Sequence, residues 1–357
     1  MRIFLTSSCM MDKHTNALPV VFSGQGRDYF GIWAVNLLLT ILTLGIYSAW
    51  AKVRRMHFFY RHTSLAGAAF DYHGEPLSIL KGRTLAFLMF MAYQISAETE
   101  PIVAAIVFVI LMAVMPWLLH RSLCFRMHNS SYRGLRFVFR GGVRQAYVVF
   151  LGLPLLILIS LGLAFPLWVH ALKVYQYGSS AFGRSEFQCA LSRAEIYRIY
   201  LVAGVVAIGV TLATTLLLGL GVAESLSMDE GAETRVLTML GGMALLAGFA
   251  MMLCVAPFVA ARVQNAVWNG LSLGPHRFRS VVSGRRLAFI TLTNLLGVIF
   301  SLGLYRPFAE LRLMKYRLQS ISMLPGGDLD DFVAFAEADL AAIGEESAEM
   351  FDVDVGL

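Results

Sequence analysis

Two asparagines occupy matching positions in two apolar stretches, and they are the first residues to consider for chemistry. Residues 36–56 align without gaps with residues 294–314, so that Asn36 matches Asn294 and Tyr47 matches Tyr305. An amide inside an apolar helix either makes a hydrogen bond to a neighbouring helix or lines a polar pathway. We favour the interhelical hydrogen bond and keep the polar pathway as the alternative.

The same alignment contains a recurring Leu-Gly pair, with a partial third copy at residues 161–167. Its glycines are Gly45, Gly162 and Gly303, and prolines follow two of them at Pro166 and Pro307. Such glycines let membrane helices pack closely, whereas a nearby proline removes a backbone hydrogen bond and can create a hinge. We favour close packing, but the hinge stays open because paired interruptions mark binding sites in transporters built from repeats.

An acidic cluster near the C-terminus could hold a cation or dock onto a basic surface. Asp328, Asp330 and Asp331 follow a Pro-Gly-Gly turn, but they lack the spacing of an EF-hand loop. Ten acidic residues and no Lys or Arg follow Arg317. We expect Asp330 or Asp331 to cap an amphipathic helix at about residues 331–343, which docks onto the protein's own basic linkers or onto a partner.

The sequence contains none of the common catalytic signatures. It has no GxxxxGK[ST] loop, no HExxH and no GxSxG. Cys9, Cys124, Cys189 and Cys254 have neither CxxC spacing nor clustered histidines, so neither a metal site nor a disulfide framework is expected. No charged residue lies in the middle of an apolar segment, which counts against ion-coupled carriers. We therefore expect no enzyme activity, no metal and no cofactor.

Composition places the chain in a membrane. Of its 357 residues, 57% are hydrophobic and 15% are charged, with a net charge of +6, whereas soluble domains carry about 25% charged residues. The basic residues flank apolar segments, so anionic lipid headgroups, and not nucleic acid, are the expected partners. The N-terminus lacks the apolar core of a signal peptide, so the first apolar segment is expected to direct insertion.

Seven apolar stretches approach or exceed the length needed to cross a hydrocarbon core about 30 Å thick. They predict an all-α, multi-pass membrane protein with an N-terminal segment (1–28), a transmembrane domain (29–323) and an acidic tail (324–357). The stretches are residues 30–51, 84–97, 101–119, 146–172, 199–223, 236–261 and 287–305.

The charges of the linkers orient these segments but leave three of them ambiguous. The linkers after segments 1, 3, 4 and 6 are basic, whereas those after segments 2 and 5 are acidic. The positive-inside rule then makes segments 2–3 and 5–6 hairpins with cytoplasmic ends. Segments 1, 4 and 7 have basic linkers at both ends, so they either break the rule or bend back without crossing. We favour ordinary kinked spans and keep re-entrant helices open.

The basic linkers share a second recurring element, in which a glycine is followed by two or three residues and then a phenylalanine. We expect short β-like linkers packed against the membrane-proximal helix ends, with glycine supplying the turn. The four copies are Gly67–Phe70, Gly134–Phe137, Gly183–Phe187 and Gly274–Phe278.

The long motif at residues 22–55 resembles the YjgN family of bacterial inner-membrane proteins, whose function is unknown. The resemblance continues through residues 67–74, 276–278 and 327–331, and so covers most of the chain. It implies a location in the inner membrane and supplies no substrate, reaction or site.

Two functions are compatible with these observations. The leading hypothesis is transport or permeation of a small or amphipathic solute, with segments 1, 4 and 7 around a central site. The rival is a non-transporting envelope scaffold or lipid-interacting protein that acts through its basic cytoplasmic face and acidic tail. A polar cavity lined by both Asn36 and Asn294 would favour transport, and a dry core would favour the rival.

Overall fold

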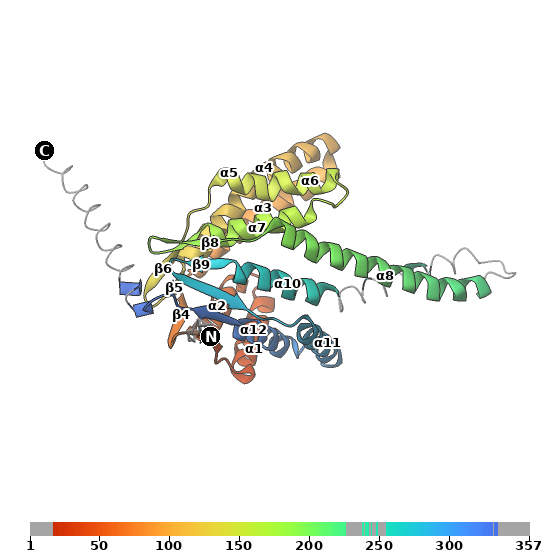
Figure 1. Ribbon diagram of the computed structural model, residues 1–357. Coiled ribbons are helices and arrows are strands. Elements are labelled where there is room, and N and C mark those ends of the chain that lie inside the picture. Colours follow the sequence, from red (N-terminus) through yellow and green to blue (C-terminus); the bar gives the residue numbers. More distant parts are fainter. Residues whose placement is uncertain are drawn as a thin grey trace, which may run out of the picture.

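The computed structural model of the chain describes residues 17–225, 238, 240–242, 244, 248, 255–330 and 332–334. These residues form a small antiparallel sheet and a set of helical hairpins that project from it (Figure 1). The strands gather at one end of the molecule, and the helices extend away from them. The sheet therefore serves as the base on which the helices are mounted.

The sheet closes on itself through the N-terminal segment. Its 11 strands follow the order β1-β11-β10-β9-β8-β7-β6-β5-β4-β3-β2. Leu18 pairs with Met323 at one end of this order, and Phe22 pairs with Thr63 at the other. The strands are β1 Leu18–Pro19, β2 Val21–Phe22, β3 Thr63–Leu65, β4 Ala68–Tyr72, β5 Ser130–Tyr132, β6 Leu135–Phe139, β7 Ser180–Phe182, β8 Ser185–Cys189, β9 Leu271–Leu273, β10 His276–Ser280 and β11 Ile321–Leu324.

The recurring Gly–Phe elements are the turns and second strands of four β-hairpins in this sheet. Each turn glycine has a positive φ, from +55° at Gly274 to +85° at Gly134, a conformation that side chains with a Cβ rarely adopt. The phenylalanines lie one beside the next along the sheet, with ring centroids 6.5, 6.4 and 6.2 Å apart for Phe70–Phe137, Phe137–Phe187 and Phe187–Phe278. These elements are thus parts of one continuous sheet and not separate linkers.

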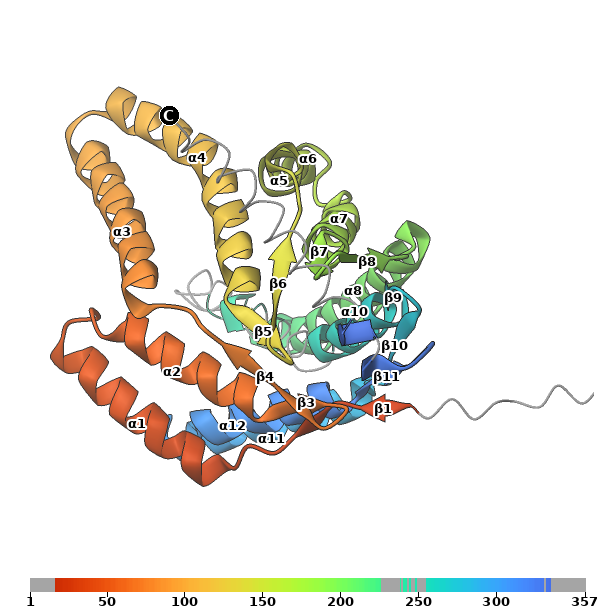
Figure 2. The same cartoon turned by 90° about the vertical axis from the view of Figure 1, so that its left-hand side faces the viewer.

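Helical hairpins connect each β-hairpin to the next, and short ones alternate with long ones around the molecule (Figure 2). The short pairs are α1–α2, α6–α7 and α11–α12, and the long ones contain α3–α4 and α8 with α10. The helices are α1 Gly26–Leu42, α2 Ser48–Arg61, α3 Pro76–Thr99, α4 Pro101–His128, α5 Val143–Tyr147, the π-helical η1 Val148–Gly152, α6 Leu153–Ile159, α7 Phe165–Gly178, α8 Arg193–Ser225, α10 Ala256–Asn269, α11 Gly284–Phe300 and α12 Arg306–Gln319.

Three apolar stretches that we expected to be kinked spans are instead the short hairpins. Leu44, Leu161 and Leu302 have φ values of 49°, 49° and 51°, and each is followed by a glycine with φ between +91° and +93°. Two successive positive φ angles reverse the chain, and the leucines at the three tips are 94–95% exposed. Segments 1, 4 and 7 therefore fold back, so that both their ends meet the sheet and the basic linkers lie on one side.

A hydroxyl group closes each of these turns. The backbone N–H of Tyr47 donates to Thr43 Oγ1 at 2.9 Å, and that of Tyr305 donates to Ser301 Oγ at 2.8 Å. The N–H of Ala164 makes the matching bond to Ser160 Oγ at 3.0 Å. These side chains satisfy N–H groups at the start of the second helix, which have no partner within that helix.

The prediction of an all-α protein with seven transmembrane helices is wrong. Among the described residues, two helices combine the length and hydropathy of a membrane span, Pro101–His128 and Arg193–Ala213. Half of the predicted segment 236–261 lies outside the described residues. Hydropathy averages register how apolar a stretch is, but they do not register a chain reversal within it, nor strands of three to five residues between helices.

Candidate functional site

The second helix of each hairpin ends on the sheet, and these helices bring basic side chains together. Arg126 lies on the last turn of α4, where its carbonyl oxygen accepts a hydrogen bond from Ser130 Oγ at the start of β5. Arg317 occupies the corresponding place on α12, just before β11. Lys173 and Lys52 extend from α7 and α2. The fold thus collects cations from helices that are far apart in the sequence.

An open chamber of about 730 Å³ lies among α1, α2, α3, α4 and α7. Four basic side chains line it, and its other polar groups are hydroxyls and amides. No Asp or Glu belongs to its described lining. The polar lining consists of Lys52, Arg55, Arg83, Arg126, Tyr29, Tyr72, Asn36, Thr40, Ser48, Ser122 and Gln176.

A second chamber of about 660 Å³ lies beside it, between α7, α8 and α10. Lys173 and Arg317 supply its charged groups, Gln264, Tyr177 and Tyr200 add polar atoms, and most of its remaining lining is apolar. Gln264 Oε1 accepts a hydrogen bond of 2.6 Å from Arg317 Nε, which holds that guanidinium in place. The charge of Arg126 in the larger chamber acts on Lys173 in the smaller one, so the two chambers together form one basic region.

The positive charges of this region act on one another. Burial lowers the pKa of Lys173, and the charges of Arg317 and Arg126 lower it further. Burial likewise lowers the pKa of Lys52, and Arg83, Arg126 and Arg55 add to the effect. Neighbouring cations that lower the pKa of these two lysines are not neutralised locally, so a bound anion would relieve the repulsion.

Glu310 neutralises one cation of the region. It forms an ion pair with Arg55 and accepts a hydrogen bond of 2.9 Å from the hydroxyl of Tyr29. These contacts join α1, α2 and α12. Within the described part of the chain, Lys52, Arg126 and Lys173 have no carboxylate within ion-pair distance. Their charge is thus available to a ligand.

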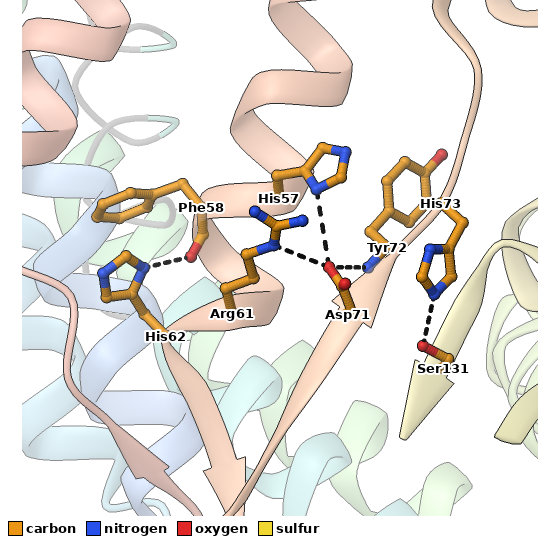
Figure 3. Close-up of polar contacts among 8 residues, drawn as sticks. All are labelled: His57, Phe58, Arg61, His62, Asp71, Tyr72, His73 and Ser131. Atoms are coloured by element: carbon orange, nitrogen blue, oxygen red, sulfur yellow. Dashed lines mark hydrogen bonds and ion pairs between the residues drawn. The ribbon is translucent and has the colours of Figure 1, made fainter. Parts of the chain in front are cut away.

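Asp71 fixes the end of α2 to the first β-hairpin (Figure 3). Its Oδ1 accepts hydrogen bonds from Arg61 Nε at 3.0 Å and from the Tyr72 N–H at 2.8 Å, and His57 Nδ1 lies 3.7 Å away. Burial opposes ionisation of Asp71, but the hydrogen bonds and the charge of Arg61 lower its pKa overall. This anchoring sets the direction in which α2 presents Lys52.

The structure separates the two matching asparagines. Asn36 lines the larger chamber, and its Oδ1 is buried without a hydrogen-bond partner among the described residues. Asn294 instead joins α11 to α12, where its Nδ2 donates to the Ala309 carbonyl at 3.0 Å and its Oδ1 accepts from Arg312 Nη1 at 3.4 Å. The two amides do not line a common cavity.

The matching tyrosines and the candidate hinge residues lie in the turns of the short hairpins. Tyr47 and Tyr305 immediately precede α2 and α12. Gly45, Gly162 and Gly303 form the three reversals, and Pro166 and Pro307 lie in the first turn of α7 and α12. Proline is well suited to that position, because its missing N–H would have no partner there. These residues thus shape tight turns and do not interrupt continuous helices.

The acidic cluster packs at the sheet. Asp328 Oδ1 accepts a hydrogen bond of 2.9 Å from the Asp330 N–H, and the Asp330 carboxylate forms an ion pair with Arg133 in the β5–β6 turn. Beyond it, Phe332 and Val333 pack into the apolar core of the sheet. Asp331 and most of the helix expected at 331–343 lie outside the described residues.

The basic region was not predicted from the sequence. Lys52, Arg126 and Lys173 read as linker charges that flank membrane segments, although all three lie on helices. One signal was available: Arg126 and Arg317 each stand in the last turn before a strand. To use this signal, one would need to know from the sequence where each helix ends and the following strand begins.

Comparison with known proteins gives a family but no activity. The family model described as "Bacterial protein of unknown function (DUF898)" matches residues 17–350. The inner membrane protein YjgN of Salmonella typhimurium (strain LT2) is 30% identical over 151 residues, which make up 42% of this chain and 38% of that protein. The inner membrane protein YjgN of Escherichia coli (strain K12) is 30% identical over 146 residues, 41% of this chain and 37% of that protein. The chain thus matches well under half the length of these relatives. No solved structure matches it.

Proposed function

This chain belongs to the family of bacterial proteins of unknown function described as DUF898, the family of the YjgN proteins, and from that premise we propose that it is an inner-membrane protein that binds the anionic headgroup of a membrane amphiphile. The binding site in this proposal is the basic region that the two chambers form. The role is one of binding, and no covalent step is part of it.

The proposed placement in the membrane puts the sheet at the cytoplasmic surface. Helices α4 and α8 cross the hydrocarbon core, and the short hairpins enter it part-way. Helix α1, with 17 residues, is about 26 Å long at 1.5 Å per residue, which is short of a core about 30 Å thick. Fully exposed leucines at the three tips support this placement, because lipid is the environment in which they cost least.

The observation that carries the proposal is the set of cations without carboxylate partners. Lys52, Arg126 and Lys173 converge from three helices on chambers whose described lining has no acidic residue. Arginine and lysine in such a setting suit phosphate or carboxylate oxygens, with which they make charge-assisted hydrogen bonds. A headgroup of this kind would neutralise charges that otherwise repel one another.

The apolar walls favour an amphiphile over a free anion. Leu37, Leu119 and Phe150 line the larger chamber together with the cations. The smaller chamber is bounded mainly by apolar side chains of α7, α8 and α10. A hydrocarbon chain can lie along these surfaces while its headgroup reaches the basic residues, and this combination is absent from small inorganic anions.

A transport role for the paired asparagines finds no support here. Asn36 lines the larger chamber, whereas Asn294 forms hydrogen bonds that join α11 to α12. The proposal therefore follows the lipid-interacting hypothesis, with the site moved from the outer basic linkers to the interior between the helices.

The test compares the stability of the full chain in neutral detergent with added phosphatidylglycerol or phosphatidylcholine. A ligand at 100 times its Kd stabilises the folded state by about 2.7 kcal/mol, so the unfolding midpoint should rise with the anionic lipid and much less with the zwitterionic one. The variant Lys52→Gln/Arg126→Gln/Lys173→Gln should lose this difference.

A matched control removes exposed cations. Arg277 and Arg279 point outward from β10, so Arg277→Gln/Arg279→Gln should keep the response to phosphatidylglycerol. The effect in the wild-type chain should weaken with added salt, because screening reduces attraction between charges. Equal stabilisation of the triple variant and the wild-type chain by phosphatidylglycerol would exclude the chamber as the binding site.

A further inference from the structure

The interior of the sheet contains an apolar cavity, which adjoins the smaller of the two chambers at Tyr177 and Trp268. Its volume is about 260 Å³, and its lining includes the four phenylalanines of the Gly–Phe elements. Tyr60, Met127, Tyr177 and Trp268 border it on the side of the helices, and Leu329, Phe332 and Val333 border it from the C-terminal segment. Apolar cavities of about 150 Å³ are large enough to bind benzene, so this one can hold a somewhat larger apolar molecule.

One fully buried polar atom in this lining has no hydrogen-bond partner among the described residues. His276, the first residue of β10, is 0% exposed, and its Nε2 makes no hydrogen bond within the described part of the chain. The ring meets that of Phe332 edge-on at a centroid distance of 4.8 Å. Contacts of this kind are too weak to replace a hydrogen bond. A buried polar atom without a partner is rare and calls for an explanation.

The other ring nitrogen determines what Nε2 can do. The Gly326 N–H donates to Nδ1 at 3.4 Å, so Nδ1 acts as an acceptor. A neutral imidazole has one acceptor nitrogen and one N–H, which places the proton on Nε2. Burial lowers the pKa of His276, which keeps the ring neutral at pH 7. The cavity therefore receives from His276 a fully buried hydrogen-bond donor that has no acceptor among the described residues.

The nearby hydroxyl groups do not accept this hydrogen bond. Tyr132 donates its hydroxyl proton to the Leu65 carbonyl at 2.8 Å, and Ser180 donates to the Gln176 carbonyl at 2.9 Å. Ser130 donates to the Arg126 carbonyl at 2.8 Å and lies 3.0 Å from the Tyr60 hydroxyl. These three hydroxyl groups donate to backbone carbonyls, and Nε2 of His276 has no partner among the described residues.

We propose that the interior of the sheet binds a neutral, mainly apolar molecule that carries one hydrogen-bond acceptor, such as the carbonyl oxygen of an aromatic ketone, quinone or ester. The acceptor oxygen accepts a hydrogen bond from the Nε2–H of His276, and the apolar part fills the space between the phenylalanines. Charged ligands are disfavoured, because no described residue of the lining carries a charge at neutral pH.

Two probes of nearly the same shape isolate the hydrogen bond. Acetophenone has a carbonyl oxygen where α-methylstyrene has a methylene group, so both fit the same space but only the ketone can accept a hydrogen bond. We expect the full chain in detergent micelles to bind acetophenone about tenfold more tightly, which corresponds to ~1.4 kcal/mol. The carbonyl ¹³C resonance of bound acetophenone should shift in the direction of a hydrogen-bonded ketone.

The variant His276→Phe keeps an aromatic ring next to Phe332 and removes the donor. It should bind the two probes equally and show no carbonyl shift, whereas His128→Phe, which changes an exposed histidine, should behave as the wild-type chain does. Empty micelles give the background from partitioning. Equal binding of the two probes to the wild-type chain, or no binding above that background, would overturn the proposal without any variant having to fold.

Discussion

Substitution of Gly45 by alanine tests the short hairpin directly. Gly45 has φ +93°, and it follows Leu44, which also has a positive φ. A Cβ at this position meets no atom within 4 Å, so the expected cost comes from the backbone conformation and not from a clash. For a residue with a Cβ, the left-handed backbone conformation costs roughly 1–2 kcal/mol of conformational free energy. We expect Gly45→Ala to lower the free energy of unfolding by that amount.

Gly31 provides a matched control in the same hairpin. It lies within α1, has ordinary helical geometry, and a Cβ there also meets nothing within 4 Å. Alanine at such a helical site is favourable by roughly 0.5–1 kcal/mol relative to glycine. The two variants should therefore shift stability in opposite directions, with a difference of about 2 kcal/mol between them.

The assay is reversible unfolding of the purified chain in mixed micelles with increasing SDS, followed by circular dichroism. If segment 1 were a continuous membrane span, Gly45 would be helical, and both variants would stabilise the chain to a similar degree. Equal midpoints for Gly45→Ala and Gly31→Ala would thus refute the chain reversal at residues 44–45. The same comparison at Gly303 would extend the result to the third hairpin.

Three further predictions concern the sheet and the hairpin tips. The folded chain lowers the pKa of His276, so the unfolded chain binds a proton at this residue first as the pH falls. The free energy of unfolding should therefore decline below about pH 6.5, and it should decline less in His276→Phe. Unfolding midpoints measured against pH test this. Arg133 and Asp330, with side chains 23% and 78% exposed, should show a coupling of about 0.5 kcal/mol in a double-mutant cycle with alanine, and no measurable coupling would refute a contribution of the pair to stability. In a chain without its native cysteines, Leu161→Cys and Leu302→Cys in sealed vesicles should resist a membrane-impermeant maleimide until detergent is added. The control Arg279→Cys should react with the same reagent from the cytoplasmic side. Rapid labelling of the hairpin tips would place them outside the lipid.

Parts of the fold could be read from the sequence because they depend on local chemistry. The apolar stretches 101–119 and 199–223 fall within α4 and α8, the two helices that qualify as spans in the described chain. The glycines of the Gly–Phe elements predicted turns, because glycine has no Cβ and adopts a positive φ readily. Basic linkers at both ends of segments 1, 4 and 7 also indicated that these segments could bend back.

The candidate site was harder to predict because its residues are close only in space. Lys52, Arg126 and Lys173 belong to different hairpins, and nothing in their local sequence distinguishes them from other bases beside apolar segments. His276 looked like part of a short motif, and its isolation inside the sheet depends on how β9, β10 and the C-terminal segment pack. Asn36 and Asn294 match in sequence but have different neighbours.

The sequence by itself determined that this chain is rich in apolar helices, that the Gly–Phe elements contain turns, and that basic residues lie between the apolar stretches, because hydropathy, glycine and charge act locally. Only the tertiary structure decided that three of the apolar stretches reverse, that strands of two to five residues join into one closed sheet, and that cations from separate helices share a chamber. Strand pairing and helix packing connect residues hundreds of positions apart, as Leu18 and Met323 show. Such contacts are set by the competition among all possible pairings, and no local pattern records their outcome.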